Sequence, residues 1–111
     1  MKKINKVGAQ GDVMFVRVDG LPDNACADDQ RGEIIVAHSE TGHHHVIERG
    51  AKMYTVPENP LIAYLEVQIE MAKLIHKRPH DTHQTLGLGR GVWKIYRQRE
   101  YTPEGWRLVQ D

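Results

Sequence analysis

Hydrophobic and polar residues alternate along much of this chain with the period of two that is typical of β-strands. The clearest case is residues 65–71, Leu-Glu-Val-Gln-Ile-Glu-Met, in which every second residue is apolar. Glu, Gln and Met favour helices, but a helix would spread the four apolar side chains around its circumference, whereas a strand places them on one face. The period therefore predicts a strand through Met71. After Ala72 the phase slips, so residues 74–76 are expected as a second short strand after a bulge or turn.

Further strands are predicted where β-branched and aromatic residues are concentrated between turn signals. They cover residues 13–18, 33–38, 43–48, 52–56, 92–101 and 106–109. The longest loop is expected from Leu21 to Gly32, and Gly87–Gly91 is expected as a flexible turn. Residues 1–11 are polar and basic with two glycines, which indicates a flexible start or a short edge strand.

About seven or eight short strands without a convincing helix predict an all-β fold, as a small β-sandwich, a jelly roll or a barrel. The length of 111 residues is typical of one domain, residues 1–111. The sequence has no internal repeat and no low-complexity tract. One small β domain is therefore expected.

Charge and cysteine content narrow the classes of partner and compartment. The 15 basic and 15 acidic residues cancel at neutral pH, which argues against electrostatic attachment to nucleic acid or an anionic membrane. No run approaches the roughly 20 apolar residues of a membrane span. The single cysteine, Cys26, cannot form an intrachain disulfide, and no apolar signal segment follows the basic start. A cytoplasmic protein is expected.

The candidate chemistry is concentrated in residues 38–48, which contain four of the seven histidines. Residues 39–42 are turn-forming, so the histidines are expected at the bend of a hairpin. Alternation along the return strand would place His43 and His45 on one face and His44 on the other. Two histidines spaced i, i+2 on a strand can reach one metal ion, which makes this stretch a candidate metal site.

Two histidines need at least one further ligand to hold an ion. The same hairpin offers Glu40 and Glu48, and the polar segment before the glycine-rich turn offers His80 and His83. Two histidines with one carboxylate would suit oxygen or hydrolytic chemistry, whereas three histidines would suit zinc and an activated water. The expected cofactor is a divalent metal ion: zinc, iron or manganese.

The histidines could also act without a metal. They could form a pocket for a small polar ligand, or an interface between subunits in which protonation acts as a switch. His38 and His76 are expected as ordinary, partly buried histidines. Ser39 is the only serine and lies outside any strained elbow, and Cys26 has no local support as a nucleophile. No catalytic residue is nominated, and whether the protein is an enzyme stays open.

Three motifs in this order resemble a known family. They are Gly11-Asp12-Val13, then Ala-His-Ser-Glu-Thr-Gly-His-His-His-Val-Ile at 37–47, then Gly-Val-Trp-Lys-Ile-Tyr-Arg-Gln-Arg-Glu-Tyr at 91–101. Together they resemble a family of small uncharacterised proteins of bacteria, phages and other mobile elements, over nearly the whole chain. The resemblance implies a protein of the bacterial cytoplasm, in the host if it is phage-encoded, and brings no activity with it.

The family pattern can be carried over by position. It corresponds to His38, Glu40, Gly42, His43 and His45, and to His83 ahead of the last strand. The leading candidates for metal ligands are therefore His43, His45 and His83, with His38 and Glu40 from the pattern and His80 from the polar segment as further candidates. The chain departs from the pattern at Ser39, where the family has glycine, at Gln84-Thr85, which replaces a Pro-Ile step, and at Trp93, which replaces tyrosine.

A weaker likeness is to the cupin superfamily, whose first motif contains His-x-His, as at His43 and His45. Only two residues separate His45 from Glu48, where that motif has three or four.

The sequence thus predicts a β domain, expected to be oligomeric, that binds a metal ion or a small polar ligand through a histidine cluster. The alternative is a non-enzymatic accessory protein of phage or mobile-element type. It would assemble as a homo-oligomer or bind a protein partner, with histidines that are structural.

Overall fold

The computed structural model describes residues 1–30, 32–37, 44–59, 61–76, 84–97, 99–102 and 105–108. These residues form eleven strands and no helix, so the all-β prediction is confirmed. No helix among them is long and apolar enough to cross a membrane.

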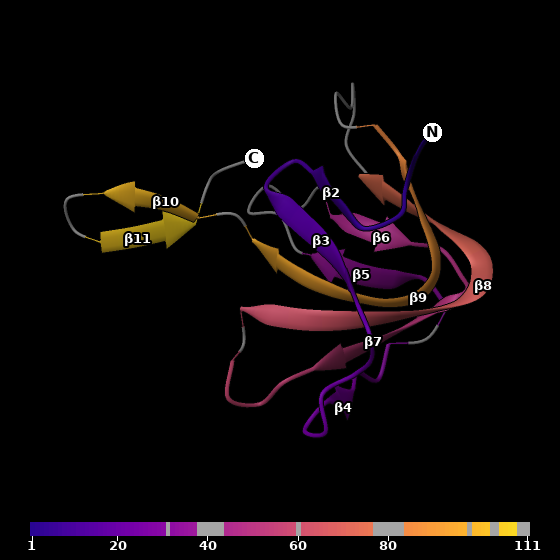
Figure 1. Ribbon diagram of the computed structural model, residues 1–111, viewed down its shortest axis with the longest axis horizontal. Coiled ribbons are helices and arrows are strands. Elements are labelled where there is room, and N and C mark those ends of the chain that lie inside the picture. Colours follow the sequence, from indigo (N-terminus) through magenta and orange to yellow (C-terminus); the bar gives the residue numbers. More distant parts are fainter. Residues whose placement is uncertain are drawn as a thin grey trace.

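Nine of the strands belong to one sheet. They are β1 Lys2–Ile4, β2 Val7–Gln10, β3 Val13–Val18, β4 Cys26–Ala27, β5 Ile34–Ala37, β6 His45–Ile47, β7 Ala51–Thr55, β8 Ile62–His76 and β9 Leu86–Arg97. The main path of the sheet is β2-β3-β9-β8-β6-β5, with β7 also beside β8, β4 beside β7, and β1 parallel to β9 (Figure 1). The other pairs are antiparallel, including a separate hairpin of β10 Arg99–Thr102 and β11 Gly105–Leu108.

The nine strands form one open sheet that curls on itself (Figure 1). Strands predicted at 13–18, 33–38, 43–48 and 52–56 correspond to β3, β5, β6 and β7. Residues 1–11 contain β1 and β2, and the expected loop after Leu21 contains β4. The glycine-rich segment expected as a flexible turn is part of β9, so that expectation was wrong.

In β8 the alternation of apolar and polar residues decides the conformation, and the helix propensity of the individual residues does not. Leu65 and Val67 are buried while Gln68 and Glu70 are exposed, and the strand runs without interruption to His76. The expected second strand at 74–76 is therefore the end of the same strand. The phase slip lies earlier than the sequence indicated, because the pairing of β8 with β9 is irregular between residues 67 and 71.

This irregularity allows both halves of the β8–β9 hairpin to contribute to one core. Leu65 pairs with Trp93 before it and Leu74 pairs with Leu86 after it, and all four side chains are buried. Residues 65 and 74 could not share a face of a regular strand, because side chains alternate. The bulge resets the alternation, so the inner face stays apolar as the hairpin curls (Figure 1).

Strand β9 follows the same bend through Gly89 and Gly91. Gly91 has a φ of 141°, a conformation that residues with a Cβ rarely adopt. The Trp93 indole Nε1 donates a hydrogen bond to the Gly89 carbonyl at 3.0 Å. The Arg17 guanidinium donates to the Arg90 carbonyl and lies 5.4 Å from the centre of the Trp93 ring. Both side chains therefore hold the backbone of β9 at its bend.

The inside of the curl is filled by one cluster of buried apolar side chains. It draws on strands from both ends of the sheet: Ile4, Val13, Phe15, Ile34, Val36, Ile47, Met53, Leu65, Val67, Ala72, Leu74, Leu86, Leu88, Trp93 and Ile95. Burial of this set is the main source of stability for a sheet with an otherwise open outer face.

The free edge of β5 is partly covered by a side chain. Gln30 Oε1 accepts a hydrogen bond from the Ile35 amide at 2.7 Å, and Gln30 Nε2 donates to the Ile35 carbonyl at 3.1 Å. The Gln30 amide thus pairs with both backbone groups of Ile35 as a neighbouring strand would. Such cover hinders the addition of another strand at this point.

We expect Gly91→Ala to destabilise the fold by about 1–3 kcal/mol, because alanine is strained at this φ. The new Cβ would also lie 2.7 Å from Arg17 Nη2. Urea unfolding followed by tryptophan fluorescence would measure the effect. Gly20→Ala is the matched control, since a Cβ at Gly20 meets nothing within 4 Å, and it should change stability by less than about 0.5 kcal/mol. Equal effects of the two substitutions would contradict the role assigned to Gly91.

Candidate functional site

The structure describes two of the seven candidate metal ligands, His45 and Glu48, and Glu48 is exposed just after β6. His45 is the first residue of β6, whereas the other five lie outside the described residues: His38, Glu40, His43, His80 and His83. Among the described residues alone, no three His, Cys, Asp or Glu side chains are grouped so as to hold a metal ion. The predicted metal site can therefore be described in the structure through the surroundings of His45.

His45 lies against a second histidine at the end of the core. It is paired across the strands with His76, the last residue of β8. The two imidazole rings are stacked, with centroids 4.2 Å apart and an angle of 2° between their planes. Both side chains are buried, with exposed fractions of 0% and 2%. Ile47 and Leu74, two residues away on each strand, belong to the apolar core, so the stacked pair continues the inner face of the sheet.

The side chain of Gln10, at the end of β2, links three other segments of the chain beside this pair. Its Oε1 lies 2.8 Å from His45 Nδ1. Its Nε2 donates to the carbonyl oxygens of Leu74 and Gln84, each at 3.0 Å. Gln10 is 2% exposed, and a buried amide at this site is stabilised because both its donor and its acceptor are used.

These contacts fix the protonation pattern of the His45 ring. Two carbonyl oxygens face one end of the Gln10 amide, so that end is the NH₂ group and the oxygen faces His45. An amide oxygen only accepts hydrogen bonds, and therefore His45 Nδ1 carries a proton and donates a hydrogen bond to Gln10 Oε1. In a neutral ring the remaining nitrogen, Nε2, then holds the lone pair that a metal ion or a hydrogen-bond donor requires.

Chain connectivity ties both histidine-rich segments to this cluster. His43 is two residues before His45, and His83 is bonded directly to Gln84, whose carbonyl oxygen accepts from Gln10. His76 is the residue after which the segment carrying His80 and His83 begins. The described ends of both segments therefore meet at the stacked histidine pair and Gln10.

Two residues of this cluster were missed by the sequence analysis. His76 was expected to be an ordinary, partly buried histidine, yet it is almost fully buried and stacked on His45. Its spacing from Ala72 and Leu74 was the available signal, since all three share one parity along β8 and are buried. Gln10 carried no comparable signal, because a glutamine in a polar segment is most often exposed.

Cys26 does not lie in a setting that activates thiols. The Cys26 side chain is exposed on β4. Its Sγ lies 3.7 Å from the carbonyl oxygen of Asn24, which is in the preceding turn. The expectation that Cys26 has no catalytic role stays a prediction, as does the same expectation for Ser39, which lies outside the described residues.

We expect Gln10→Leu to lower the free energy of unfolding by about 2–4 kcal/mol, since it removes three hydrogen bonds and one buried unsatisfied group costs about 1–3 kcal/mol. Denaturant unfolding would measure this loss. Gln84→Leu is the control, because the Gln84 side chain is exposed and only its backbone carbonyl is used. A loss below about 0.5 kcal/mol for Gln10→Leu would contradict the bridging role.

Long-range ¹H–¹⁵N NMR of chelator-treated protein should show neutral His45 with the proton on Nδ1 and an unprotonated Nε2. The reason is the orientation of the Gln10 amide, whose oxygen faces Nδ1. The reverse pattern, with the proton on Nε2, would contradict this arrangement of Gln10 and His45.

Comparisons with known proteins place the chain in a family. The model of a family described as a domain of unknown function (DUF8820) matches residues 9–98, which include Gln10, His45 and His76 but not β10 and β11. Searches of curated proteins and of solved structures each found no match. The match covers most of the 111 residues and agrees with the expected membership of an uncharacterised family. The chain therefore belongs to the family of the domain of unknown function DUF8820.

Proposed function

We propose that this protein binds a divalent metal ion, zinc, iron or manganese, where β6 begins and β8 ends. His45 is one ligand through Nε2, and His43 and His83 complete the set. The observation that carries the proposal is the hydrogen bond from His45 Nδ1 to Gln10 Oε1 at 2.8 Å. Metal-bound histidines almost always donate their other ring nitrogen to a carboxylate, carbonyl or water, which sets the tautomer and the ring orientation.

The setting of His45 also supports the proposal. The stacked ring of His76 fixes the plane of the His45 ring, and Gln10 fixes its rotation within that plane. A ligand held in this way loses little conformational entropy when an ion binds. A neutral imidazole can bind an ion directly, because its lone pair is available without the loss of a proton.

The other two ligands come from the chain segments that adjoin His45 and Gln84. His43 has the i, i+2 spacing that lets two strand histidines reach one ion. His83 is bonded to Gln84, whose carbonyl oxygen already contacts Gln10 at 3.0 Å. His38, Glu40 and His80 are further candidates from the same segments. With three protein ligands, a position stays open on the ion for water or a small polar ligand.

A second function is favoured by the burial of His45 and His76. Two histidines that are packed and stacked inside a core can be purely structural, with Gln10 as a polar partner of His45. The protein would then be a cytoplasmic accessory protein of phage or mobile-element type that forms homo-oligomers or binds a protein partner.

We expect protein purified without a nickel column to contain near-stoichiometric zinc, iron or manganese by elemental analysis. His43→Ala and His83→Ala should each weaken metal binding at least about tenfold, because the loss of even an outer-shell partner costs about 10–100-fold. His44→Ala is the matched control, since alternation along the strand places it on the opposite face from His43 and His45.

The two candidate functions separate in the same experiment. Trace metal that is unchanged by His43→Ala and His83→Ala would refute the metal site. Size-exclusion chromatography with light scattering would then test the second function, which requires a mass above that of one 12.7 kDa chain, alone or with a partner.

A further inference from the structure

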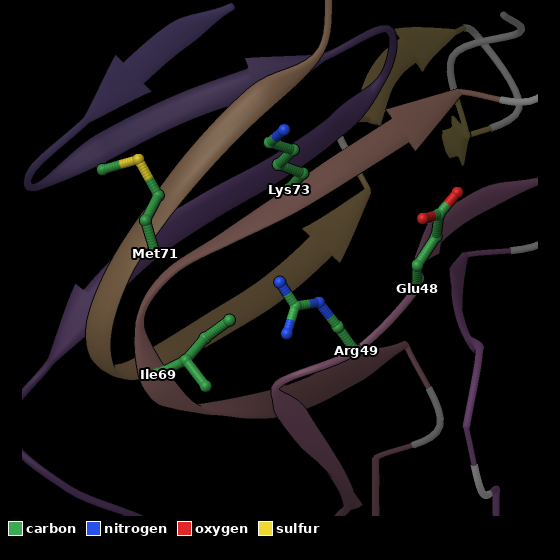
Figure 2. A pocket seen from close by; sticks show the side chains of 5 residues that line it. All are labelled: Glu48, Arg49, Ile69, Met71 and Lys73. Atoms are coloured by element: carbon green, nitrogen blue, oxygen red, sulfur yellow. The ribbon is translucent and has the colours of Figure 1, made fainter.

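A second candidate site lies beside β8, and its nearest residues, Glu48 and Lys73, are each three residues along the chain from one of the stacked histidines. It is a pocket of about 210 Å³ lined by Glu48, Arg49, Ile69, Met71 and Lys73. Figure 2 shows Arg49 between Ile69 and Lys73, with Met71 and Glu48 on opposite sides of it. Three of these five side chains are charged, and none of them belongs to the histidine cluster.

The bend in β8 creates this pocket. β8 pairs with β6 from Leu74 to His76 and with β7 from Ala63 to Val67. Between these two stretches, the Gln68 amide donates a backbone hydrogen bond to the Gly50 carbonyl at 2.8 Å. The β6–β7 connection is therefore not paired with β8 as a strand over residues 69–73, and the pocket lies beside this stretch.

The connection that carries Glu48 and Arg49 is held against β8. Gly50 has a φ of 85°, and Ile69 packs so closely over it that a Cβ at Gly50 would collide with the Ile69 side chain. The backbone on which Arg49 is mounted is thus fixed by close packing and by the bond to Gln68. A site with a fixed backbone needs less ordering when a ligand binds.

The charged groups of the pocket have no partner among the described residues. Across the residues that the structure describes, the Arg49 guanidinium and the Lys73 ammonium make no ion pair or hydrogen bond, and neither does the Glu48 carboxylate. The two cations and one carboxylate leave a net charge of +1. Ile69 and Met71 add an apolar wall. A complementary ligand carries one negative charge and a short apolar portion.

We propose that this pocket binds a small aliphatic carboxylate. Its oxygens contact Arg49 and Lys73, and its hydrocarbon chain lies against Ile69 and Met71. Guanidinium groups bind carboxylates through two parallel hydrogen bonds, and lysine adds a point charge. The volume of about 210 Å³ accommodates a chain of a few carbon atoms.

The test is an NMR titration of ¹⁵N-labelled protein with sodium hexanoate. The amides of residues 48–50 and 69–73 should shift in a saturable way. Arg49→Gln and Lys73→Gln should each weaken binding about tenfold, because a hydrogen bond between charged groups contributes about that factor at an exposed site. Glu48→Gln should strengthen binding, since it removes the only negative charge of the pocket.

The controls are a variant and two other probes. Lys6→Gln removes an exposed lysine that is not part of the pocket, and it should leave hexanoate binding unchanged. Hexylammonium, with the same chain and the opposite charge, should not shift these amides. Arg49 and Lys73 are exposed, so their variants should keep the wild-type unfolding transition, which is measured alongside.

Three outcomes would overturn the proposal. The first is the absence of any shift at residues 48–50 and 69–73 with hexanoate up to about 10 mM, which is about ten times a Kd of 1 mM. The second is binding that Arg49→Gln and Lys73→Gln leave intact. The third is a result in which inorganic phosphate binds at least as tightly as hexanoate and is weakened by the same variants. That result would assign the site to phosphate groups. Metal analysis is a separate readout, so the histidine site can stand or fall without affecting this one.

Discussion

The bend shared by β8 and β9 is the constraint on which the rest of this structure depends. A single open sheet can bury one face only by curling over it, and the two longest strands, β8 and β9, lie in the middle of the main path. Curling would turn polar residues inward if the alternation of side chains were kept. The bulge between residues 67 and 71 resets the alternation, and Arg17 and Trp93 hold the carbonyls of β9 at the bend.

The bend also sets the position of both candidate sites. Beyond it, β8 leaves β7 and joins β6, which brings His76 opposite His45. The pocket that contains Arg49 and Lys73 lies beside the same change of partner. His45 and His76 continue the inner face and are buried, whereas Arg49 and Lys73 are exposed. One irregularity in one strand therefore accounts for a buried polar cluster and for a charged pocket.

Burial makes the hydrogen bonds of Gln10 important for the end of the core. Polar groups inside a protein are costly unless they are paired, and Gln10 pairs with His45, Leu74 and Gln84 at once. These partners lie 35, 64 and 74 residues away along the chain. The first strands of the chain thus close the end of the curled sheet, and β2 is an edge strand, which was one of the two expectations for residues 1–11.

The sequence by itself determined the all-β class, most strand positions and the hairpin that presents His45, because alternation between the faces of a strand is a local property. It did not locate the bulge, because apolar and polar residues alternate without interruption from 65 to 71, although the pairing of β8 with β9 shifts between residues 67 and 71. It also did not identify Gln10 and His76 as the partners of His45. Only the tertiary structure decided those contacts, because they join residues from distant strands, and the curl of the sheet brings these together.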